Sequence, residues 1–143
     1  MLRFRHLQKE AEALVGGLMV TEFLLGRTYP DVEFGLFSRY PNYTSFLAFF
    51  VESGYTYKPK SFQPLSINDV SSWVDKQAEL NHNFPNERGV IAAFEFIHTS
   101  DLYADPESEA YKNKRKIIIV VTKRTPLEPI LSLANSMCFL LFY

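Results

Sequence analysis

Two acidic side chains and a histidine lie close together where an apolar segment gives way to a polar one. Glu95, His98 and Asp101 are of the types that hold a divalent metal or exchange protons with a substrate. Their spacing does not bring three side chains together on a strand, so they converge only if the chain bends after Ile97. Two interpretations stay open, a catalytic site and a Glu95 carboxylate paired with a nearby cation. We assign no metal ligands.

A second candidate site follows an apolar run near the C-terminal end of the sequence. Lys123, Arg124 and Thr125 stand at a predicted strand-to-helix junction, where free helix amides can bind an anion. The segment lacks the glycine-rich loop that lets a phosphate approach the backbone. Thr125 with Glu128 also fits a capping box, with Pro126 at the first helical position. An anion site and an ordinary helix cap are therefore both open.

A short basic segment precedes the same apolar run, and it could meet nucleic acid. Acidic residues lie in the same connection, which favours a self-compensating exposed loop over a nucleic-acid interface. The basic residues are Lys112, Lys114, Arg115 and Lys116, and the acidic ones are Asp101, Asp105, Glu107 and Glu109.

Composition and charge exclude several classes of function. The formal net charge is -1, which argues against broad attraction to nucleic acid or anionic lipid. The apolar runs are shorter than the roughly 20 residues that span a bilayer, so we expect no membrane association. The single cysteine, Cys138, cannot form an internal disulfide, which favours a reducing, cytoplasmic setting. No serine or cysteine stands in a sequence pattern typical of a catalytic nucleophile. The acidic residues and lysines do not form a nuclease motif. We expect no cofactor.

Hydrophobic patterns predict a single domain over residues 1–143, of α/β or α+β class. We expect a mixed sheet of about four to five strands with about four helices, which ends in a strand-helix-strand unit. The predicted strand at 115–122 contains five successive apolar residues, as in a central strand covered on both faces. The predicted strands of the sheet lie near residues 31–38, 90–97, 115–122 and 137–143.

Helical spacing predicts a first helix that contains Phe4, Leu7 and Ala11 and continues to Leu14 and Val15. The segment at 18–25 fits a helix or a strand. A short helix is expected at 44–53, closed by a left-handed glycine at 54, and an edge strand or an extended segment at 55–58. A longer helix should begin near 65–69 and run to about 80.

The start of that longer helix carries a recognisable signature. Ser66 can cap the backbone amide of Asp69, and Leu65 is placed to pack on Val70 as a hydrophobic staple. We expect both features to fix the angle at which the chain enters the helix.

The chain contains 13 Phe, 8 Tyr and 1 Trp, more ring surface than one small core obviously needs. The uncharged segment at 137–143 supplies three candidate interface residues, Phe139, Phe142 and Tyr143. These observations favour a non-catalytic interaction or assembly protein, with a homo-oligomer or a protein partner. The alternative is a small metal-dependent or nucleic-acid-processing enzyme that uses Glu95 and the basic loop.

Overall fold

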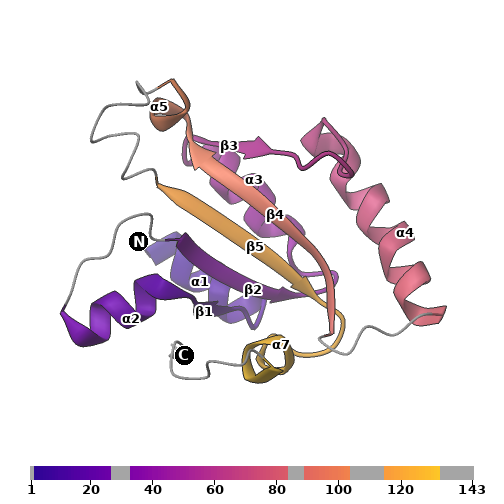
Figure 1. Cartoon of the computed structure of the whole chain (residues 1–143), viewed down its shortest axis with the longest axis horizontal. Helices are drawn as coiled ribbons and strands as arrows, with labels where there is room; N and C mark the ends of the chain where they lie inside the picture. Colours follow the sequence, from indigo (N-terminus) through magenta and orange to yellow (C-terminus); the bar gives the residue numbers. More distant parts are fainter. Residues whose placement is uncertain (1, 27–32, 84–88, 104–114, 133–143) are drawn as a thin grey trace.

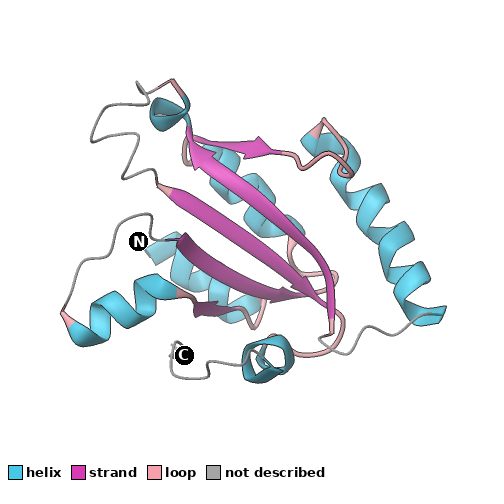
Figure 2. Ribbon diagram, in the orientation of Figure 1, coloured by secondary structure: helices cyan, strands magenta, loops and turns pink. Residues whose placement is uncertain are grey.

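The computed structural model describes residues 2–26, 33–83, 89–103 and 115–132, which form one mixed sheet with helices packed against it (Figures 1 and 2). The predicted strand at 137–143 lies outside these residues. The described elements, in chain order, are α1 (Leu2–Glu10), β1 (Leu14–Gly16), α2 (Leu18–Leu25), β2 (Glu33–Arg39), α3 (Thr44–Glu52), β3 (Tyr55–Lys58), the 3-10 turn η1 (Ile67–Asp69), α4 (Val70–Asn83), β4 (Val90–His98), α5 (Thr99–Leu102), β5 (Lys116–Thr122) and α7 (Leu127–Ser132).

The five described strands are ordered β1-β2-β5-β4-β3. Strand β5 pairs parallel with β2 and antiparallel with β4, and the two outer pairs are antiparallel. The mixed sheet, the central position of β5 and the edge position of β3 are confirmed. Pro59 follows β3 directly, and a proline is tolerated there because an edge strand needs fewer ladder amides.

The two faces of the sheet are covered unequally. Helices α1, α3 and α4 pack on one face, where alternate residues of β2, β4 and β5 form the main core (Figure 1). On the second face, Ile130 of α7 packs with Leu14 and Phe37 in a smaller cluster. Ile118 and Val120 of β5 also point to this second face and are only half-buried. Among the described elements, β5 is therefore fully covered on one face only.

The main core contains a connected network of aromatic rings among its aliphatic side chains. Phe94 is fully buried and meets three rings, those of Tyr43, Tyr57 and Trp73, with centroids 6.0 to 6.3 Å away. The other rings of this connected network are Phe4, Phe34, Tyr40, Phe46, Phe49, Phe50, Tyr55 and Phe96. The core therefore accounts for much of the ring surface that seemed excessive in the sequence.

The N-terminal prediction is wrong at its end. Helix α1 stops at Glu10, and Leu14 and Val15 belong to strand β1, which pairs with β2. Glu12 adopts a left-handed conformation with φ of 50°, which ends the helical path before those residues. The segment left open, 18–25, forms helix α2.

Helix α3 ends as expected, because Gly54 has a φ of 84° in the position that follows the Ser53 cap. The predicted start of the longer helix is correct only in part. Ser66 does cap a backbone amide, but the donor is Asn68 rather than Asp69 (3.2 Å), since a 3-10 turn precedes α4. Leu65 is 88% exposed, so the predicted staple on Val70 is wrong.

Candidate functional site

The three residues proposed for catalysis do not form one cluster. Glu95 lies opposite Lys58 of β3 and Ile118 of β5 in the sheet register, on the second face. His98 lies on the other face of β4, where its ring meets the ring of Tyr55 at a centroid distance of 5.1 Å. The odd spacing of Glu95 and His98 on a strand explains this separation.

His98 and Asp101 are joined through Ser100, because the chain bends into α5 directly after β4. Ser100 Oγ lies 2.8 Å from His98 Nδ1 and donates a hydrogen bond to Asp101 Oδ1 at 2.9 Å. The guanidinium of Arg115 donates to Ser100 Oγ at 2.7 Å. The bend that we required after Ile97 is present, and it gathers His98 and Asp101 without Glu95.

Arg115 holds the buried carboxylate of Asp101 through several hydrogen bonds. Its backbone amide and Nε both donate to Oδ2 at 3.0 Å, and Nη2 donates to Oδ1 at 2.9 Å. The side-chain hydrogen bonds from Arg115 are the main reason that the pKa of Asp101 lies well below its usual range. This carboxylate therefore stays ionised and is a poor proton acceptor near neutral pH.

Ser100 lies next to a histidine and an aspartate, the residue types that accompany a catalytic serine, but the hydrogen bonds among the three differ from those of a catalytic site. A nucleophilic serine needs a base that can take its proton, with an acid that orients the base. Here the Asp101 carboxylate accepts a hydrogen bond from Ser100 itself, and no direct contact among the described residues joins it to His98 to orient the imidazole ring. The arrangement suits a structural network that ties α5 to the start of β5.

The described part of the chain contains no group of three or more His, Cys, Asp or Glu side chains placed to hold a metal ion. Within the same residues, no helix has both the length and the apolar character needed to cross a membrane.

The anion-site residues lie at the junction between β5 and α7, as the sequence predicts. Thr125 Oγ1 accepts a hydrogen bond from the Leu127 amide at 3.0 Å, so Thr125 acts as a helix cap. The backbone amide of Lys123 donates to the Gly89 carbonyl at 2.8 Å. Arg124 is exposed. Helix α7 is short, with six residues, and its first turn contains Glu128.

The basic loop is described only at its C-terminal end. Arg115 is bound to Asp101, and Lys116 Nζ donates to Glu33 Oε1 of β2 at 2.7 Å. Lys112 and Lys114 lie outside the described residues, as do Phe139, Phe142 and Tyr143. Both described cations are therefore paired with acids, but only Asp101 belongs to the predicted self-compensating connection, because Glu33 lies in β2.

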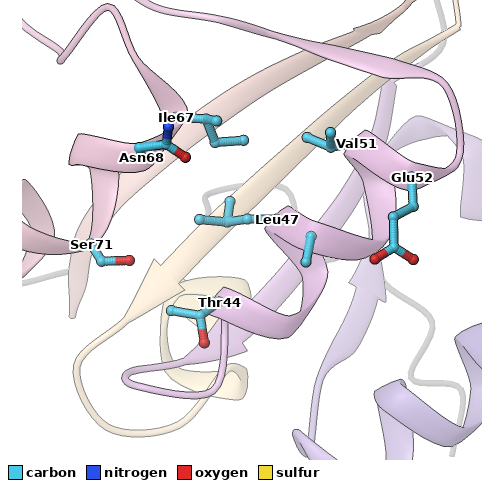
Figure 3. A pocket seen from close by; sticks show the side chains of 8 residues that line it. Thr44, Leu47, Val51, Glu52, Ile67, Asn68 and Ser71 are labelled. Atoms are coloured by element: carbon cyan, nitrogen blue, oxygen red, sulfur yellow. The ribbon is translucent and has the colours of Figure 1, made fainter.

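The structure adds a surface that the sequence did not predict, an open groove of about 440 Å³ between α3 and the start of α4 (Figure 3). We call it the α3 groove. Leu47 forms part of its floor, and Val51 and Ile67 approach each other across it (Figure 3). The remaining lining residues are Thr44, Ala48, Glu52, Asn68 and Ser71.

Helices α3 and α4 pack on the same face of the sheet through different residues, and the groove lies between α3 and the start of α4 (Figure 1). Helix α3 buries Phe46, Leu47 and Phe50 in the core, which leaves Ala48 and Val51 on its outer side. Val51 is 46% exposed. Apolar residues on every side of a short helix are a signal in the sequence that could have located this surface.

The chain matches no known family model, no curated protein and no solved structure. Its function must therefore be inferred from the geometry of its own residues.

Proposed function

We propose that this chain is a cytoplasmic protein-interaction or assembly protein that associates with itself. The observation that carries the proposal is the α3 groove, an open concave surface whose floor and walls include Leu47, Val51 and Ile67. Its volume lies within the roughly 300–1,000 Å³ of ordinary ligand pockets. Helix surfaces of this kind bind apolar side chains of a partner segment.

The surroundings of the groove give the proposal further support. Leu65 is 88% exposed and lies two residues before Ile67, and Val51 is 46% exposed within the groove itself. Exposed apolar side chains that adjoin a concave surface are typical of binding sites, whereas isolated ones are common on any surface. The aromatic composition no longer contributes to the argument, because the core contains many of the rings.

The described residues give less support to the alternative, which is an enzyme. Glu95 is separated from His98 and Asp101, and the Ser100 hydroxyl donates a hydrogen bond to the Asp101 carboxylate, whose low pKa makes it a poor base. The single cysteine of the chain supports the reducing, cytoplasmic setting in the proposal.

Light scattering over a wide range of protein concentrations tests the proposal. Self-association predicts a mass that rises above the 16.5 kDa of one chain as the concentration increases. We expect Phe139→Ser and Phe142→Ser, which change two of the proposed interface residues, to lower this mass while the protein stays folded. A parent protein that remains at the mass of one chain throughout would reject self-association.

A further inference from the structure

The chemistry of the α3 groove limits the ligands that it can bind well. Of its eight lining residues, Glu52 is the one that carries a formal charge. Arg3 Nη2 lies 2.6 Å from Glu52 Oε2 and neutralises that charge across α1 and α3. A charged ligand would lose its hydration in the groove without gaining a free countercharge. The side chains of an uncharged apolar segment have no such charge hydration to lose.

The chain itself contains such a segment. Residues 133–143 contain no charged side chain and include Met137, Phe139 and Phe142. We propose that the α3 groove of one copy binds the 133–143 segment of a second copy, with Phe139 or Phe142 as the anchoring side chain. This inference rests on the proposed self-association, and it adds the surface that receives the segment.

The position of α7 favours a second copy over the same chain. Ile130 of α7 packs on the second face of the sheet with Leu14 and Phe37, whereas Phe46 and Phe50 of α3 pack on the first. A segment that follows α7 must therefore pass around the sheet to reach the groove of its own chain. Fully extended, residues 133–143 span at most about 40 Å, which is enough to reach a copy that lies alongside.

The donor and the receiving surface are different parts of the molecule, so the contact is heterologous. Such contacts produce a closed ring, an open chain of copies, or a dimer in which two copies exchange segments. In each case one groove and one segment make a complete contact. This property permits a test by mixing two defective variants.

The first variant, Val51→Arg, places a cation in the groove and leaves the segment intact. The second variant combines Phe139→Ser with Phe142→Ser and leaves the groove intact. Leu80→Arg is the matched control, because Leu80 is a 55% exposed helix residue that does not line the groove. Circular dichroism and thermal unfolding establish that each variant is folded, and Ala48→Arg replaces Val51→Arg if the latter is not.

We expect both variants to run at the mass of one chain by light scattering and Leu80→Arg to keep the mass of the parent. An equimolar mixture of the two variants should contain dimers, because the intact segment of one variant can bind the intact groove of the other. If Val51→Arg keeps the parent mass while the Phe139, Phe142 variant loses it, the inference is rejected and self-association stands. The inference is also rejected if both variants lose mass but their mixture forms no dimers. A monomeric parent would reject both the inference and the proposed function.

Discussion

The carboxylate of Asp101 accepts three hydrogen bonds from Arg115, one from the backbone amide and two from the guanidinium. Asp101 belongs to α5 and Arg115 directly precedes β5, so these contacts join the two ends of the connection between β4 and β5. Asp101 is 7% exposed, and a buried carboxylate is stable only when its charge is compensated in this way.

Replacing this carboxylate should lower the free energy of unfolding in a pH-dependent manner. We expect Asp101→Asn to cost about 1.5–3 kcal/mol at pH 7, because a charge-assisted pair is lost. The folded-state pKa of Asp101 is depressed below the unfolded value of about 3.9. The stabilisation is therefore present above that value and is lost as the pH falls through it toward the folded pKa. Urea denaturation at several pH values between about 7 and 2 measures this.

Glu95→Gln is the control for this prediction. It removes a carboxylate that has no hydrogen bond or ion pair with any described residue, and we expect a change below about 0.5 kcal/mol. If Asp101→Asn and Glu95→Gln have equal effects, the pairing with Arg115 does not stabilise the fold.

Two phenylalanines of opposite exposure should respond very differently to truncation. Phe94 is fully buried, and Phe94→Ala should lower the free energy of unfolding by about 3–5 kcal/mol through lost burial and a cavity. Phe62 is 67% exposed, and Phe62→Ala should change it by less than about 0.5 kcal/mol. Trp73 contacts Phe94, so its fluorescence during denaturation reports both measurements. Similar losses in the two variants would contradict the position of the aromatic core.

The Thr125 hydroxyl should contribute to stability as a helix cap. Thr125→Ala is expected to cost about 1 kcal/mol, and Thr125→Ser should recover most of it, because serine also caps. Thermal unfolding measures both. An anion site predicts in addition that phosphate raises the melting temperature of the parent protein but not that of Lys123→Ala or Arg124→Ala. If phosphate has no effect on the parent, Thr125 is only a cap.

A close approach between two strands makes Gly35 sensitive to substitution. A Cβ atom at Gly35 would lie 2.8 Å from the carbonyl oxygen of Gly16, its register partner in β1. We expect Gly35→Ala to displace β1 and to cost about 1–3 kcal/mol. Hydrogen exchange of the Leu14 and Val15 amides should become faster than in the parent protein. Unchanged exchange at both amides would show that β1 tolerates the added atom.

The strands could be predicted where the spacing of apolar residues fits a strand but not a helix. Residues 117–121 are apolar on successive positions, which no exposed helix permits, and β5 is central as expected. The spacing of Leu14 and Val15 fits a helix and a strand equally well. The left-handed conformation that ends the helix before them occurs at Glu12, and the sequence gives no sign of it because the residue is not a glycine. Ambiguous spacing explains the one misassigned strand.

The candidate sites were harder to predict than the strands, because they depend on contacts between distant residues. Asp101 and Arg115 are 14 residues apart in the sequence, and their charges alone do not identify them as partners. The α3 groove forms between two helices whose separation is set by the sheet beneath them. Periodicity within one segment carries no information on such a separation.

The central position of β5 determines the order in which the sheet can be completed during synthesis. Strands β1 to β4 all leave the ribosome before β5. The ion pair between Glu33 of β2 and Lys116 of β5 cannot form until Lys116, which is 83 residues later, has been synthesised. Until then, the inner edges of β2 and β4 have exposed backbone groups and apolar side chains. The nascent chain therefore passes through a stage in which β2 and β4 can pair incorrectly, and this stage ends only when β5 is inserted between them.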